Sequence, residues 1–79
     1  MWDAELLDVK GLLCPMPIIR LQNRSRELTA GARLWLQATD AAVLQDIPAW
    51  CRIHGHGLVQ QQELHGIYHF LIQLHAGRK

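Results

Sequence analysis

Cys14 is the residue whose type and surroundings point most directly to chemistry. Pro15-Met16-Pro17 follows it, and apolar residues then recur at helical spacing. Proline suits the first turn of a helix, and a residue before proline avoids helical angles, so Cys14 is predicted just outside a helix that begins at Pro15. A helix N-terminus stabilises negative charge and lowers the pKa of a thiol. We therefore expect Cys14 to favour its thiolate, with the amides of Met16 and Ile18 as donors to the sulfur.

The residues around Cys14 favour a carrier of a chemical group over a hydrolase. Pro15 and Pro17 should stiffen the turn and hold the sulfur outward, while Lys10 and Arg20 add positive potential. A hydrolase with a cysteine nucleophile needs a base and an oxyanion hole. No histidine or acid is near Cys14 in the sequence, although the fold could bring one in. The alternative is an ordinary buried cysteine at a helix start.

The elements that must position Cys14 can be predicted from periodicity and turn residues. Ile18, Leu21, Ser25 and Leu28 form the inward stripe of the first helix, with Met16 on the other side. The first predicted elements are a strand over Leu6–Val9, a helix from Pro15 to about Thr29 and a strand over Arg33–Thr39. A second helix is predicted to be capped by Asp40 and to end at Gly55, with a kink or restart near Asp46 because of Pro48. Two strands follow over Leu58–Leu64 and Ile67–Leu74, joined by a turn at His65-Gly66.

This order of elements predicts an α/β fold. The first three elements suit a crossover between parallel strands, and the last two suit a hairpin. With four strands, two helices on one sheet face give the simplest closed core. We expect a two-layer sandwich with a four-stranded mixed sheet, formed by a single domain over residues 1–79 because a chain of 79 residues has room for one core.

Composition and charge exclude several classes of protein. The formal charge is +1 and the pI about 7.9, so direct nucleic-acid binding is not expected. No apolar run is long enough to span a bilayer, and the acidic N-terminus lacks the features of a signal peptide. Two cysteines 37 positions apart, without a Cys-x-x-Cys motif, do not form a disulfide framework. We expect a cytoplasmic protein without a cofactor.

Other reactive or charged residues have simpler explanations. Cys51 falls on the apolar face of the second helix, which favours a core role over that of a resolving thiol for Cys14. Arg20 and Arg24, one turn apart, form either a solvated face or a docking site for an acidic partner surface. Five histidines lack the spacing of a zinc site, so no metal is expected; they are His54, His56, His65, His69 and His75.

A family resemblance covers nearly the whole chain. Leu7-Asp8-x-x-Gly11-Leu12-x-Cys14-Pro15-x-Pro17 resembles the N-terminal signature of the TusA/SirA-like sulfur carriers. The similarity continues through Ala38-Thr39-Asp40, Asp46-Ile47-Pro48-x-Trp50-Cys51, His54-Gly55-His56 and Tyr68-x-Phe70-Leu71-Ile72.

The resemblance implies four strands, two helices and a persulfide on Cys14. In such carriers a cysteine desulfurase or related donor loads the cysteine, and an acceptor protein takes the sulfur for tRNA thiolation, cofactor maturation or sulfur metabolism. The resemblance leaves open whether the protein is an enzyme, a sulfurtransferase that acts through the cysteine persulfide, or a carrier alone. The best-known carrier has an acidic residue where this chain has Met16, and that exposed apolar group is expected to influence partner choice.

Two alternatives to a sulfur carrier stay open at this point. A similar layered fold occurs in the C-terminal domain of the third bacterial translation initiation factor, so a non-catalytic regulatory or RNA- or protein-binding module is possible. A Cys14–Cys51 disulfide switch is the second alternative, and it requires Cα atoms within about 7 Å.

Overall fold

The computed structural model describes residues 4–75 of the chain. Its element order, strand-helix-strand-helix-strand-strand, confirms the predicted order. The elements are β1 (Ala4–Val9), α1 (Met16–Glu27), β2 (Arg33–Ala38), α2 (Val43–His54), β3 (Gly57–Leu64) and β4 (Ile67–Gln73).

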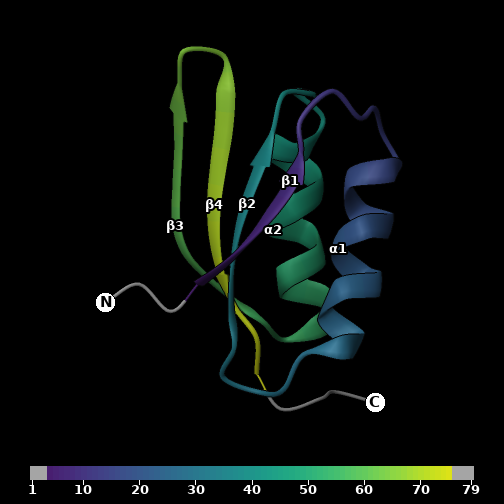
Figure 1. Ribbon diagram of the computed structural model, residues 1–79, viewed down its shortest axis with the longest axis vertical. Coiled ribbons are helices and arrows are strands. Elements are labelled where there is room, and N and C mark those ends of the chain that lie inside the picture. The colour runs from purple at the N-terminus through teal and green to yellow at the C-terminus, as the bar shows by residue number, and fades with distance from the viewer. Residues whose placement is uncertain (1–3, 76–79) are drawn as a thin grey trace.

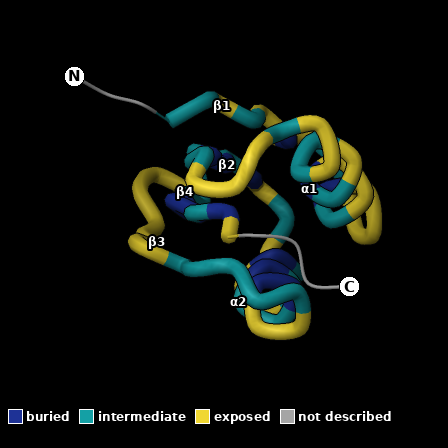
Figure 2. Tube along the Cα trace, turned by 90° about the horizontal axis from the view of Figure 1, so that it is seen from below, coloured by how far each residue is buried: buried dark blue, intermediate teal, exposed yellow. Residues whose placement is uncertain are grey.

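The four strands form one mixed sheet in the order β1-β2-β4-β3. β1 is parallel to β2, and β4 is antiparallel to both β2 and β3. The two helices cover one face of this sheet, α1 beside β1 and α2 beside β3 and β4 (Figures 1 and 2). The predicted two-layer α/β sandwich is therefore confirmed. Both helices begin at the same end of the molecule, where β1 and β2 finish (Figure 1).

The core lies between the sheet and the helices. Residues of β2 are buried at every second position, as alternation predicts, because successive side chains of a strand point to opposite faces. Leu71 is also buried, although it lies on the other face of β4, opposite Trp35 in the ladder with β2. The fully buried core side chains include Val9, Leu21, Leu34, Leu36, Ile47, Phe70 and Ile72.

Two predicted helix boundaries are wrong. α1 ends at Glu27 rather than Thr29, because Leu28 already has an extended backbone. α2 is preceded by Ala42, not capped by Asp40, whose carboxylate instead accepts the Ala42 N–H at 3.2 Å. The helix runs through Pro48 without the restart predicted near Asp46, since the apolar face on both sides of the proline is buried against the sheet.

Among residues 4–75 no helix is long and apolar enough to cross a membrane.

Candidate active site at Cys14

Hydrogen bonds between two loops hold Cys14 in place. The turn after β1 opens at Gly11, which has a positive φ of 83° and donates its N–H to the Thr39 hydroxyl at 2.9 Å. The Cys14 N–H donates to the Asp40 carboxylate at 2.7 Å. Thr39 and Asp40 belong to the connection between β2 and α2. The position of Cys14 is therefore fixed to the end of the neighbouring strand as well as to its own chain.

A second carboxylate faces the sulfur itself. The exposed Cys14 thiol donates a hydrogen bond to Asp46 in the first turns of α2, with 3.4 Å between Sγ and Oδ2. This hydrogen bond raises the Cys14 pKa above its ordinary value, and partial desolvation and the negative charges of Asp46 and Asp40 act in the same direction. The expectation of a favoured thiolate is therefore wrong for the resting protein, because two carboxylates oppose the positive end of the helix.

The Met16 amide, one of the two donors predicted for the sulfur, is engaged elsewhere. The Met16 N–H donates instead to the Leu13 carbonyl at 2.8 Å. Lys10 is also engaged elsewhere, since its ammonium group donates to Gln37 at 2.9 Å and pairs with Asp8. The dominant local influence on the Cys14 thiol is thus acidic.

The two prolines have different places in the site. Pro15 is the N-cap residue of α1, so the predicted helix start is correct to within one residue. Pro17 is fully buried, which anchors the first turn of α1 in the core. Met16 and Leu13 flank the cysteine with side chains 38% and 71% exposed. Two exposed apolar side chains therefore lie close to Cys14 in the chain, beside the carboxylates of Asp40 and Asp46.

The two arginines predicted to dock partners are in different situations. Arg20 is exposed on α1. The Arg24 guanidinium is held by the Glu5 carboxylate of β1, with one hydrogen bond of 2.8 Å, and by Glu27 at 2.6 Å. These contacts raise the pKa of Arg24 and lower that of Glu5. Arg24 is thus held by two ion pairs, whereas Arg20 has none with the described part of the chain.

Cys51 and the histidines lie apart from this chemistry. Cys51 is 2% exposed within the core cluster, and burial raises its pKa to about 11. Both cysteines are free thiols, Cys14 exposed and Cys51 buried. Within residues 4–75 no three His, Cys, Asp or Glu side chains are grouped as a metal site.

Asp40 and Asp46 were missed as site residues by sequence reasoning. Asp46 is 32 positions from Cys14, so their proximity depends on the fold. A signal did exist: the carboxyl ends of adjacent parallel strands meet at one edge of a sheet, where α/β proteins place their sites. Cys14 follows β1, and Asp40 follows β2, its parallel neighbour.

Comparisons with known proteins agree on one family. The family model described as "Sulfurtransferase TusA" matches residues 5–74. The chain is 44% identical over 71 residues to a protein named sulfur carrier protein TusA from Pseudomonas paraeruginosa, with 90% of each chain covered. It is also 44% identical to a protein of that name from Pseudomonas putida strain W619, with 90% of this chain and 89% of the relative covered. This chain therefore belongs to the TusA sulfurtransferase family.

Proposed function

We propose that this protein is a sulfur carrier that holds sulfur as a persulfide on Cys14. Membership of the TusA family and the names of its relatives support the carrier role. The single observation that carries the assignment to Cys14 is its position: it is an exposed thiol on a turn held by the neighbouring loop. Cys51, the other free cysteine of the described chain, is buried.

Loading requires no net oxidation. The Cys14 thiol gives its proton to solvent or to a base of the donor protein, since the Asp46 and Asp40 carboxylates disfavour the thiolate. The resulting thiolate attacks the terminal sulfur of a donor persulfide, so a new S–S bond forms to Cys14 and the donor S–S bond breaks. The donor leaves as a thiolate, and Cys14 carries the terminal sulfur. This is thiol–disulfide exchange with a persulfide in place of a disulfide.

Unloading is the same step with the roles reversed. A thiolate of the acceptor protein attacks the terminal sulfur on Cys14, and the Cys14 thiolate leaves. The Cys14 thiolate then takes up a proton from solvent, which restores the resting hydrogen bond to Asp46. We propose a cysteine desulfurase or a related persulfide enzyme as the donor and place both exchanges in the cytoplasm, where thiols stay reduced.

The surface around Cys14 suits brief docking of such partners. Leu13 and Met16 offer apolar contact beside the sulfur, and Arg20 adds a positive charge farther along α1. Complementary charge raises the rate of encounter more than it raises affinity. We propose that Met16 and Arg20 contact both donor and acceptor, with Arg24 at the rim because Glu5 and Glu27 already hold it.

Mass spectrometry of the loaded protein tests this function. The full chain is incubated with a cysteine desulfurase, pyridoxal phosphate and cysteine, and peptides are then analysed without reductant. The expected result is the gain of one sulfur atom on the Cys14 peptide, which dithiothreitol removes. Cys14→Ser should gain none.

Cys51→Ala is the matched control, since it removes the other thiol and leaves Cys14 unchanged. It should load as the wild type does. Sulfur found on Cys51, or loading retained in Cys14→Ser, would contradict the proposal. So would failure to load with several desulfurases and with thiosulfate-derived donors while Cys14 still reacts with an alkylating agent.

A further inference from the structure

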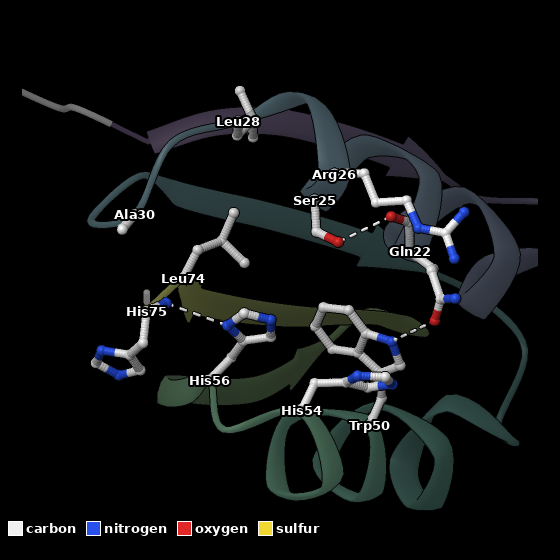
Figure 3. Close-up of a pocket in the computed structure, with 10 residues that line it drawn as sticks. All are labelled: Gln22, Ser25, Arg26, Leu28, Ala30, Trp50, His54, His56, Leu74 and His75. Carbon is white, nitrogen blue, oxygen red and sulfur yellow. Dashed lines mark hydrogen bonds between the residues drawn. The ribbon is translucent and has the colours of Figure 1, made fainter. Parts of the chain in front are cut away.

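A second concave site lies at the opposite end of the helices from Cys14. It is a pocket of about 450 Å³ between the last turns of α1 and α2 and the end of β4 (Figure 3). This volume is within the range of about 300–1,000 Å³ that is usual for small-molecule sites. Because the pocket is lined by the last turns of the helices and Cys14 precedes the first turn of α1, persulfide chemistry does not account for it.

The charged and polar groups of the pocket favour a negative ligand. Arg26 lines it from α1, and His54, His56 and His75 line it from the other side. Among the described lining residues none is acidic. Nor does the Arg26 guanidinium have an ion pair or hydrogen bond within residues 4–75. Arg26 therefore lies on one side of the pocket and the imidazoles on the other, with no carboxylate among the described residues that line it (Figure 3).

Hydrogen bonds and ring contacts fix the walls of the pocket. The Trp50 indole N–H donates to Gln22 at 3.1 Å and links the two helices. The Trp50 ring stacks on His56 with ring centroids 4.9 Å apart and contacts His54 at 5.2 Å (Figure 3). The backbone N–H of His75 donates to His56 Nδ1 at 3.1 Å. In the neutral His56 ring this leaves the proton on Nε2, a donor that has no hydrogen-bond partner within residues 4–75.

Gly55 brings His56 into this arrangement. Its left-handed φ of 75° ends α2 and turns the chain, so that the His56 N–H reaches back to the Cys51 carbonyl at 2.8 Å. Glycine adopts this conformation without the strain that a side chain would add. The histidine consequently stacks on Trp50 from beyond the end of the same helix.

We propose that this pocket binds a small organic anion with one phosphate or carboxylate group on an apolar or aromatic body. The imidazoles of His54, His56 and His75 would hold the charged group, and the Arg26 side chain would turn toward it from α1. Leu28, Ala30 and Leu74 supply apolar wall for the remainder of the ligand. Arginine and protonated histidine form charge-assisted hydrogen bonds to such groups, which are about twice as strong as neutral ones.

Binding should strengthen as the pH falls. The groups next to His56 are His54 and Trp50 from α2 and His75 after β4, while Arg26 of α1 lines the same pocket. Burial first, and then the like charges of His54 and His75, lower the pKa of His56. The partial negative charges of the two helix C-termini act in the opposite direction. A bound anion would stabilise the protonated imidazoles, so lower pH and ligand should reinforce each other.

NMR titration of the full chain with phenyl phosphate tests the proposal. The expected result is saturable movement of the Trp50 indole N–H and the His56 amide with a Kd of about 1 mM or tighter at about pH 6. Affinity should be weaker at pH 8 than at pH 6, because an imidazole without its extra proton attracts the anion less. Arg26→Gln should weaken binding about tenfold, and Arg52→Gln, an exposed α2 arginine outside the pocket, should leave it unchanged.

Two further probes distinguish the contribution of the ligand's negative charge from that of its aromatic ring. Benzamide, which has the ring without the negative charge, should bind far more weakly than phenyl phosphate, and inorganic phosphate should compete with phenyl phosphate. The proposal is overturned by an absence of saturable shifts at Trp50 and His56, by equal binding of benzamide, or by an equal loss in Arg26→Gln and Arg52→Gln. None of these outcomes depends on sulfur loading at Cys14.

Discussion

Replacing Asp46 with asparagine should make Cys14 a faster nucleophile. The Asp46 carboxylate accepts a hydrogen bond from the thiol at 3.4 Å, and its charge opposes a negative charge on the sulfur. Asparagine has nearly the same shape without the charge, so the Cys14 pKa should fall toward its ordinary value. Below the pKa, the thiolate fraction rises tenfold for each pH unit of that fall. Both groups face water, which screens charge, so the expected gain is on the order of three- to tenfold.

The assay is the rate of Cys14 alkylation by iodoacetamide, followed by mass spectrometry between about pH 6 and pH 10. Asp46→Asn should shift the pH profile to lower pH. Asp8→Asn is the control, because Asp8 pairs with Lys10 and is not among the groups that raise the Cys14 pKa. An unchanged rate in Asp46→Asn, or an equal increase in Asp8→Asn, would refute the reasoning.

Three further predictions concern the core and its flank. Cys51→Ser places a hydroxyl in the core and should reduce the free energy of unfolding by about 1–3 kcal/mol, measured by urea titration. A loss below about 0.5 kcal/mol would contradict the burial of that thiol. Leu21→Ala, in the buried core, should reduce the free energy of unfolding by about 2–5 kcal/mol. Ile53→Ala, at a side chain that is 75% exposed, should reduce it by less than about 0.5 kcal/mol. Equal losses in the two variants would argue against the core described above. Glu5→Gln removes the charged partner of Arg24. The Glu5 pKa is lowered in the folded protein, so the Glu5 carboxylate stabilises the fold at neutral pH. That stabilisation is lost as the pH falls through the lowered pKa. The urea midpoints of wild type and Glu5→Gln should therefore differ at pH 7 and converge in acid, and a constant difference would exclude this ion pair as the cause.

Much of the fold could be predicted from sequence because its signals are local. The alternation in β2 and the Gly66 turn between β3 and β4 depend on residues close in the chain. The start of α2 was harder to predict. Asp40 has a side chain typical of a helix cap, but its carboxylate accepts hydrogen bonds from the backbone N–H groups of Ala42 and Cys14. Its second contact comes from a loop 26 positions away, which no local pattern reveals.

The chemistry of Cys14 was predictable only in part, for the same reason. The proline-flanked cysteine and its exposed position follow from the local sequence, but the direction of its pKa shift depends on Asp46 from another element. The second pocket has the same dependence. His54 and His56 are close in sequence, yet Arg26 and His75 reach them only through the packing of α1 and β4.

The two hydrogen bonds that connect the Cys14 turn to Thr39 and Asp40 also affect how partners are exchanged. When a loop becomes ordered only on binding, the lost conformational entropy weakens the association. A larger interface is then needed to offset that loss. Here that ordering is already present in the free protein. A small contact around Leu13 and Met16 can therefore be sufficient for docking, and small contacts dissociate quickly. The rigidity of this turn thus favours the short residence times that a shuttle between two partners requires.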